Sequence, residues 1–342
     1  MTSEAVSPET PLAAPDTFDV SVVIPVYGGE QTIGPLVEGL AEVFEAEGER
    51  WEVILVCDRP RDDSWTVARG LAERFETVSA VRLLRNFGQH PATLLGIRRA
   101  RGRTIMTMDE DLQHDPKDVP AVLAGSRDRG AIAYGTFEEP RHGLWRNVTS
   151  KLAKAFLARY VGPGIANHAT AFRAFPAELR EAFATYRGER VAIDVLLSWS
   201  GAPIQTVPCR HAPRAAGESG YTFRKLVGYL ADLLVGYSIA PLRLASSLGL
   251  LTVAIALGVA LWVVVAFVVF GRQVPGFAFT AVSIAVFAGV QLLALGVIGE
   301  YLGRLYFDHL GRPQYLVAEV VEEAGQSVDR GTVSTSNDDH SP

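Results

Sequence analysis

Residues 104–113 are Thr104-Ile105-Met106-Thr107-Met108-Asp109-Glu110-Asp111-Leu112-Gln113, an apolar run that ends in three successive carboxylates. Ionised side chains resist burial, so the acids should follow a buried strand rather than belong to the core. Asp109 and Asp111 are one residue apart, so in an extended chain they point the same way. Two such carboxylates can bind a divalent cation, Mg²⁺ or Mn²⁺, that also holds a pyrophosphate. A solvated turn without a ligand is the alternative.

Short apolar segments and helical stretches alternate around this run. Predicted strands are 20–24, 51–56, 80–84, 104–108 and 131–134, and predicted helices are 30–46, 63–75, 90–100 and 117–126. Such alternation predicts an α/β fold with a doubly wound, mostly parallel sheet. In this arrangement a nucleotide site lies at the carboxyl ends of the strands.

Two long uncharged segments follow, 244–271 and 273–299, with Arg272 between them. Each exceeds the roughly 20 residues that cross a bilayer core, so they predict a transmembrane hairpin with spans at about 246–270 and 277–299. A pair of buried core helices is the alternative. Basic residues flank both outer ends of the hairpin, which predicts that both termini are cytoplasmic.

The predicted organisation has five parts. They are a disordered tail (1–17), an α/β domain (18–215), a juxtamembrane amphipathic segment (216–241), the hairpin (242–304) and a C-terminal segment (305–342) that is disordered from Gln326. Apolar residues recur at helical spacing in Tyr221–Ser238, which predicts a helix lying on the membrane surface. A helix packed on the α/β domain is the alternative.

Composition narrows the function classes. The chain has 342 residues, a net charge of −6 and only two cysteines, Cys57 and Cys209. The acidic balance argues against nucleic-acid binding, which calls for a basic patch. Two distant cysteines without metal-ligand spacing indicate neither a disulfide framework nor a zinc site. Residues 1–17 lack the basic and apolar regions of a signal peptide.

The ends of the first two predicted strands carry further candidate residues. They read Ile24-Pro25-Val26-Tyr27-Gly28-Gly29-Glu30 and Val56-Cys57-Asp58. A carboxylate at this edge can accept hydrogen bonds from a base or ribose hydroxyl, so Asp58 is expected to contact a nucleotide. Asp62 is expected to cap the helix that begins near Ser64, and capping is the alternative for Asp58 as well.

These motifs, together with Arg85-Asn86-Phe87-Gly88-Gln89-His90, resemble the family 2 inverting glycosyltransferases of GT-A fold. The polyprenyl-phosphate branch of that family includes dolichol-phosphate mannose synthases and undecaprenyl-phosphate glucosyl- and aminoarabinose transferases. Four later motifs resemble this branch, namely Gly217–Tyr221, Arg224–Leu226, Pro241–Arg243 and Gly299–Arg304. The likeness runs from about Val20 to Tyr315.

The resemblance implies an enzyme that moves a hexosyl or pentosyl group, with inversion, from a nucleotide sugar to a polyprenyl phosphate. The product would serve glycosylation outside the cytoplasm. The catalytic domain would lie on the cytoplasmic face of the inner membrane, among membrane lipids, with a flippase as partner and a tetramer as assembly. The donor-binding residues implied are Pro25, Tyr27, Glu30, Asp58 and Asp109, with the cation on Asp109 and Asp111.

Two departures from the family pattern fall in the nucleotide pocket. Gly28-Gly29 stands where the family usually has Asn-Glu, and Cys57-Asp58-Arg59-Pro60 stands where it has Asp-Asp-Gly-Ser. Because of these departures, the sequence does not specify which base the nucleotide donor carries. It does not specify the sugar either. The departures also motivate one rival hypothesis, a catalytically silent membrane scaffold. A processive polysaccharide synthase is the other rival, but the Gln-x-x-Arg-Trp signature of that class is missing near Trp199.

The acceptor side can be argued from charge. A phosphate monoester has a second pKa of about 6, so a polyprenyl phosphate is largely a dianion at neutral pH and needs cations more than a strong base. Arg214 and the 217–219 loop are favoured because they precede the amphipathic segment. Asp194 lies within an apolar run, and the resemblance implies a base or orienting group there. A surface carboxylate, or a buried one paired with an arginine, is the alternative. The acceptor candidates are Arg173, Arg210, Arg214, Ser219 and Arg224.

Overall fold

A computed structural model describes residues 18–136, 170–184, 186–188, 191–210, 240–270, 276–309, 313–322 and 326–327. Contacts divide the chain into two compact units. One unit comprises residues 1–219 with 313–342, and the other comprises 220–312. The predicted tail (1–17) and the predicted amphipathic helix (221–238) lie outside the described residues.

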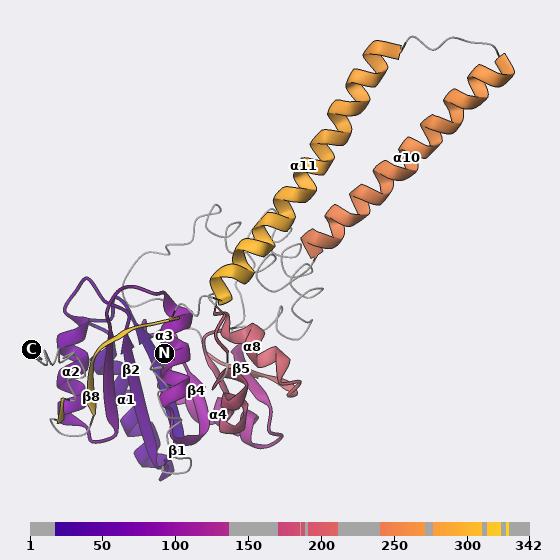
Figure 1. The fold of residues 1–342 in the computed structure, drawn as a ribbon. Coiled ribbons are helices and arrows are strands. Elements are labelled where there is room, and N and C mark those ends of the chain that lie inside the picture. Colours follow the sequence, from indigo (N-terminus) through magenta and orange to yellow (C-terminus); the bar gives the residue numbers. More distant parts are fainter. Residues whose placement is uncertain are drawn as a thin grey trace, which may run out of the picture. The chain divides into compact units, whose positions relative to one another are not determined.

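Four parallel strands form the centre of the first unit, in the order β4-β1-β2-β3 (Figure 1). They are β1 (Phe18–Val26), β2 (Trp51–Cys57), β3 (Val78–Leu83) and β4 (Gly102–Thr107). The helices that connect or follow them are α1 (Ile33–Glu47), α2 (Ser64–Arg74), α3 (Gln89–Arg99) and α4 (Val119–Arg127), with a short 3-10 helix, η1 (Pro116–Asp118). The predicted strands and helices of this region are confirmed, with boundaries shifted by a few residues.

The sequence of β1 explains why it lies in the middle of the sheet. Val20, Val22, Val23 and Ile24 are fully buried, as expected for a parallel strand covered on both faces. Val22 and Ile24 pack with apolar side chains of α1, α2 and α4, whereas Val23 packs with those of α3 and α8 (Ile193–Trp199). Two apolar clusters, one on each face, therefore hold the doubly wound sheet together.

The strand predicted at 131–134 is confirmed as β5 (Ile132–Thr136), but its two neighbours in the sheet were not predicted from the sequence. β6 (Arg173–Pro176) lies antiparallel between β4 and β5 (Ile132–Thr136), and β7 (Ile204–Pro208) pairs in parallel with β5. Two short helices, η2 (Ala177–Arg180) and α7 (Glu181–Ala184), follow β6. β6 and β7 have only four and five residues, which is too few for a clear alternation of apolar and polar residues.

The chain also returns to the sheet after the apolar helices. β8 (Val317–Glu322) pairs antiparallel with β3, and β9 (Gln326–Ser327) pairs with β8. The sequence analysis predicted no strand here and expected disorder from Gln326, so for Gln326–Ser327 that expectation is wrong. The full order is β7-β5-β6-β4-β1-β2-β3-β8-β9.

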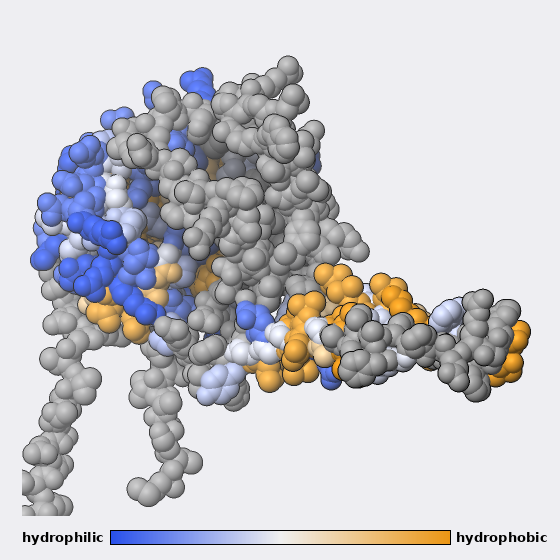
Figure 2. Space-filling model, turned by 90° about the horizontal axis from the view of Figure 1, so that it is seen from above, coloured by the Kyte–Doolittle hydropathy of each residue, from blue (hydrophilic) through white to orange (hydrophobic). Residues whose placement is uncertain are grey.

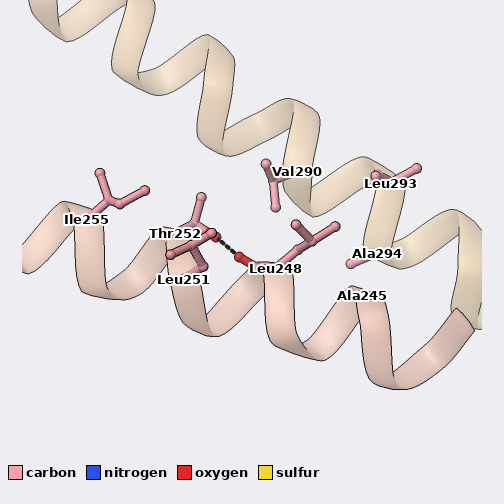
Figure 3. A pocket seen from close by; sticks show the side chains of 8 residues that line it. All are labelled: Ala245, Leu248, Leu251, Thr252, Ile255, Val290, Leu293 and Ala294. Atoms are coloured by element: carbon pink, nitrogen blue, oxygen red, sulfur yellow. Dashed lines mark hydrogen bonds between the residues drawn. The ribbon is translucent and has the colours of Figure 1, made fainter. Parts of the chain in front are cut away.

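The second unit contains α10 (Ala240–Phe270) and α11 (Gly276–His309). By length and composition both are able to cross a membrane, with windows at Leu242–Val259 and Val286–Gly303 of mean hydropathy 1.9 and 1.6. None of either window is buried, unlike a core helix, and Figure 2 shows apolar surface gathered on these helices. Apolar side chains line the groove between them, and the hydroxyl of its one polar residue, Thr252, donates to the Leu248 carbonyl within the same helix (Figure 3).

Candidate active site

The candidate site lies where the order of the central strands reverses. The chain passes from β1 to β2 on one side, and β4 pairs with β1 on the other. A doubly wound sheet usually binds its ligand in a crevice at this point, between the loops that follow the two strands. Met108 donates to the Val23 carbonyl at 3.2 Å, which is the last backbone bond between the two strands before the loops separate.

Asp109 and Asp111 stand just beyond β4, as predicted. Both are partly exposed. Asp109 Oδ1 accepts a hydrogen bond from the side-chain amide of Gln89 at 2.5 Å, and Asp111 Oδ1 accepts one from the Gln113 backbone at 3.2 Å. Both of these donors are neutral amides, which do not neutralise a carboxylate. Charged oxygen at this edge fits a hard divalent cation.

A fully protein-made metal cage is not found in the described part of the chain, where no three His, Cys, Asp or Glu side chains gather around a common point. Two carboxylates would therefore supply only part of a coordination shell. Mg²⁺ in particular usually takes one or two carboxylates and completes its shell with water and phosphate oxygen.

Glu110, between the two aspartates, turns back toward β1. Its carboxylate accepts hydrogen bonds from the backbone N–H of Tyr27, at 3.1 and 3.0 Å to its two oxygens, and from that of Gly28 at 3.0 Å. Burial raises the pKa of Glu110 to about 7, and the bonds from Gly28 and Tyr27 act in the opposite direction. The side chain thus joins the loop after β4 to the loop after β1.

Asp58, at the end of β2, is only 3% exposed. Its two oxygens accept hydrogen bonds from the backbone N–H of Phe87 and of Gly88, both at 2.7 Å. Burial raises the pKa of Asp58, and these two bonds lower it in part. Gly88 has a φ of 99°, which a residue with a side chain rarely adopts. Asp58 therefore fixes the turn that leads into α3, and its direct contact with a nucleotide stays a prediction.

Asp62 forms hydrogen bonds at the start of α2, although the N-cap position itself is Asp63, whose side chain makes no capping hydrogen bond. Asp62 Oδ1 accepts hydrogen bonds from the Ser64 hydroxyl at 2.5 Å and from the Ser64 backbone at 3.3 Å. The Ser64 hydroxyl in turn accepts one from the Gly29 backbone at 2.9 Å, and Asp62 Oδ2 accepts one from the Glu30 backbone at 3.4 Å. The loop after β1 is therefore held from the α2 side as well as by Glu110.

The remaining donor candidates occupy this same loop. Pro25 lies within β1 opposite Val56, the Tyr27 side chain is 43% exposed, and Glu30 is exposed. Arg59, one of the departures from the family pattern, has a φ of 47° and donates from its guanidinium to the Leu84 carbonyl at 2.5 Å. Donor binding by Pro25, Tyr27 and Glu30 stays a prediction, although their loop borders the crevice.

Arg173 and Asp194 form a buried ion pair beside β4. Arg173 is 3% exposed, its guanidinium pairs with Asp194, and its Nε donates to the Thr107 hydroxyl at 3.1 Å. The Tyr134 hydroxyl donates to Asp194 at 3.0 Å, and burial raises the pKa of Tyr134. Burial lowers the pKa of His90 nearby, which Asp194 opposes. The arrangement matches the alternative left open for Asp194, a carboxylate paired with an arginine, and the proposed acceptor roles stay predictions.

Of the other acceptor candidates, the structure describes only Arg210, which does not lie beside β4. Arg210 is exposed after the edge strand β7, separated from β4 by β5 and β6, and its backbone donates to Asp118 at 2.7 Å. The remaining three lie outside the described residues, namely Arg214, Ser219 and Arg224.

Comparison with known proteins identifies the family. The model of glycosyl transferase family 2 matches residues 21–184. Undecaprenyl-phosphate 4-deoxy-4-formamido-L-arabinose transferase of Enterobacter sp. (strain 638) is 31% identical over 323 residues, which is 93% of this chain and 96% of the relative. The chain belongs to glycosyltransferase family 2. It is therefore a glycosyltransferase, and its sheet is of the predicted GT-A type.

Solved structures of glycosyltransferases also align with this family 2 chain. Mannosyl-3-phosphoglycerate synthase from Rubrobacter xylanophilus aligns with a TM-score of 0.46 and 16% identity over 64% of this chain and 72% of that one. Glucosyl-3-phosphoglycerate synthase from Mycobacterium tuberculosis, in complex with Mn²⁺ and UDP-glucose, aligns with a TM-score of 0.44 and 16% identity over 64% and 78%.

Sequence reasoning missed several residues of this family 2 site. The sequence assigned no role to Gln89 beyond its place in a motif, although its side chain donates a hydrogen bond to Asp109. It also assigned no separate role to Glu110, which accepts a hydrogen bond from the Gly28 backbone. Ser64 and Tyr134 were not considered as site residues. The position of Gln89 at the start of α3 was a usable signal, because residues there face the carboxyl ends of the strands.

Proposed function

We propose that this family 2 glycosyltransferase transfers a sugar from a nucleotide donor to the phosphate of a polyprenyl lipid, with inversion at the anomeric carbon. The supporting observation is the 31% identity with an undecaprenyl-phosphate sugar transferase over 93% of the chain. This similarity extends far beyond residues 21–184, and so includes the two apolar helices. A lipid acceptor requires an active site at a membrane surface, which such helices would provide.

On the donor side, Asp109 and Asp111 would hold Mg²⁺ or Mn²⁺. When bound, the cation offsets the charge that develops on the leaving nucleoside diphosphate. Gln89 keeps Asp109 oriented through a neutral bond that does not compete for its charge. Tyr27 and Glu30, on the loop across the crevice, would contact the nucleotide, and Asp58 would support the wall of the pocket from behind.

On the acceptor side, the lipid phosphate is itself the nucleophile. As a dianion it needs to be held in line with the anomeric carbon, which is a task for cationic side chains. Arg173 lies at the start of β6, next to the end of β4, with its guanidinium oriented by Asp194 and Thr107. Asp194 would then act by orienting Arg173. Phosphate contacts are also proposed for Arg210, Arg214, Ser219 and Arg224.

The membrane setting completes the proposal. The two apolar helices would span the inner membrane as a hairpin, with the catalytic unit in the cytoplasm where nucleotide sugars are made. A flippase would carry the lipid-linked sugar across the membrane, and a tetramer is the proposed assembly.

The test is transfer by the purified full chain in detergent. The chain is incubated with undecaprenyl phosphate, Mg²⁺ or Mn²⁺ and a panel of sugar nucleotides, and products are identified by mass. The expected result is one undecaprenyl-phosphate monosaccharide and release of one nucleoside diphosphate. A ladder of lengthening glycans would indicate a processive synthase instead. Absence of nucleoside diphosphate release with every donor would contradict the proposal and favour the silent scaffold.

A further inference from the structure

The loops after β1 and β4 are joined by a single carboxylate. Beyond the last backbone bond between the strands, Glu110 reaches across from the β4 loop and accepts hydrogen bonds from the N–H groups of Tyr27 and Gly28. Both donors belong to the backbone, so the contact fixes where the chain runs rather than where a side chain points. The crevice between these loops is the proposed donor site.

Gly29 makes room for this contact. A Cβ atom built on Gly29 would lie 2.6 Å from Glu110 Oε2 and 3.3 Å from Glu110 Cδ. The carboxylate of Glu110 therefore occupies the space that any side chain at position 29 would need. At Gly28, in contrast, a Cβ would meet nothing within 4 Å. The absence of a side chain is thus required at one of the two glycines only.

This packing accounts for one departure from the family pattern. The resembled family usually has a carboxylate at position 29, on the β1 loop, whereas here Gly29 is bare and a carboxylate enters the same space from the β4 loop. The two residues are 81 positions apart (110 − 29) and their side-chain volumes exclude each other. Gly29 and Glu110 therefore form a matched pair.

We propose that Glu110 is a positioning residue for the donor site. Its carboxylate holds the Tyr27–Gly29 loop at a fixed distance from Asp109 and Asp111. Gly29 is needed because a side chain there would occupy the space of this carboxylate. The proposal rests on the proposed function, because it assumes that the crevice binds the nucleotide sugar. Glu110 itself need not touch the donor. It acts through the backbone of the β1 loop on one side and through its two aspartate neighbours on the other.

The first test is a double-mutant cycle for stability, which needs no substrate. Gly29→Ala should lower the Tm of the full chain in detergent by at least about 3 °C, because the new methyl group overpacks the site and expels the Glu110 carboxylate. In a Glu110→Ala background, Gly29→Ala should lower the Tm by at most half as much. Some loss of Tm remains because the new Cβ also lies 2.7 Å from Ile33 Cγ2. The matched control, Gly28→Ala, should leave the Tm unchanged. Equal losses from Gly29→Ala in both backgrounds would overturn the proposed pairing.

The second test separates positioning from a structural role. Glu110→Ala should raise the KM for the nucleotide sugar at least about tenfold while leaving the KM for undecaprenyl phosphate within about twofold. Glu110→Gln retains one acceptor oxygen for the two N–H groups and should stay within about threefold of the parent. Gly29→Ala should reproduce the donor defect, and the Gly29→Ala/Glu110→Ala double variant should be no worse than either single one. Multiplied defects, or equal changes in both KM values, would overturn the positioning role. If the parent chain transfers no sugar, the proposed function fails, while the stability cycle still decides the pairing.

Discussion

Asp58, Glu110 and Asp194 all face the carboxyl edge of the sheet, yet each carboxylate has a different set of partners. Asp58 and Glu110 accept backbone N–H groups of the neighbouring loops, and Asp194 pairs with Arg173. Asp109 accepts a hydrogen bond from the Gln89 side-chain amide, and Asp111 accepts one from the Gln113 backbone. Asp109 and Asp111 stay the predicted metal ligands, because they follow β4 directly and are both partly exposed at the carboxyl edge of the sheet.

Asp111→Asn should therefore abolish transfer while the fold stays intact. An amide is a weaker ligand for a hard cation than a charged oxygen, and the amide oxygen of Asn could still accept the hydrogen bond from the Gln113 backbone. The measurement is transfer as a function of metal concentration, with the Tm as a check on folding. Asp128→Asn, at an exposed carboxylate after α4, is the control and should have parental activity. Near-normal turnover of Asp111→Asn with unchanged metal dependence would refute the metal assignment.

Arg173→Ala should reduce the free energy of unfolding by about 3 kcal/mol, because it leaves the largely buried Asp194 without its cation. The side chain of Arg173 is 4% exposed and that of Asp194 is 21% exposed. Arg50→Ala, which breaks the pair with Asp19, is the control, since Arg50 is 57% exposed and surface pairs contribute less than about 1 kcal/mol. Urea denaturation followed by tryptophan fluorescence measures both. Equal losses would mean that the Arg173–Asp194 pair is solvated in the folded protein.

The two cysteines should be inert in the folded protein. Burial raises the pKa of Cys57 to about 12 and that of Cys209 to about 11, so both remain thiols at pH 8, whereas the unfolded chain ionises near pH 9. Between pH 9 and 11 the folded state thus retains protons that the unfolded state loses, and stability should fall as pH rises. Iodoacetamide at pH 8 should label neither cysteine until urea is added. Rapid labelling of native Cys57 would show that β2 is accessible.

At the scale of elements, β8 is the least expected part of the fold. It begins after α11 in sequence yet covers the outer edge of β3, with Val321 only 3% exposed. Arg82 pairs with Glu319 at 2.8 Å, and Arg98 donates to Gln314 at 3.1 Å and to the Tyr315 hydroxyl at 3.0 Å. A bare β3 edge would expose a row of unpaired backbone groups, which invites aggregation.

Ending the chain after His309 should therefore destabilise the catalytic unit. Loss of the buried Val321 side chain and of the β3–β8 hydrogen bonds should lower the free energy of unfolding by about 3 kcal/mol. Size-exclusion chromatography and the Tm in detergent measure the effect, with aggregation as a second expected sign. Ending the chain after Ser327 is the control, since it retains β8 and β9 and should behave as the parent. If the chain that ends after His309 also had the parental Tm, β8 would contribute nothing to the sheet's stability.

For the molecule as a whole, the chain segments before and after the apolar hairpin belong to one sheet. β1 to β7 precede α10, β8 follows α11, and β8 pairs with β3. Segments paired in one sheet lie on the same side of a membrane. An even number of crossings between them is therefore required, which two spans satisfy.

Both termini should accordingly be cytoplasmic, on the side that basic residues also favour. A reporter that is active only in the cytoplasm, fused after Pro342, should be active, and one that is active only outside should be silent. The same pair of reporters fused within 271–275, between α10 and α11, is the control and should give the opposite result. External activity of the C-terminal fusion would overturn the orientation and the use of cytosolic sugar nucleotides.

The parallel core, the acidic pair after β4 and the two apolar helices were predictable from the amino-acid sequence alone. Each of these depends on residues close together in the chain: the alternation of apolar segments, the Asp109–Asp111 spacing and the length of the uncharged runs. Such local patterns follow from the period of an element or from the thickness of a bilayer, and need no knowledge of which elements meet.

Which of these residues act together became visible only once the chain was folded. Glu110 bonds to Tyr27 across 83 positions, Arg173 pairs with Asp194 across 21, and β8 joins β3 from beyond the hairpin. These contacts depend on strand order and loop paths, which one sequence does not reveal because many partners are chemically equivalent. Gly29 illustrates the physical reason: the bare position was visible in the sequence, but the carboxylate that fills its space came from another strand.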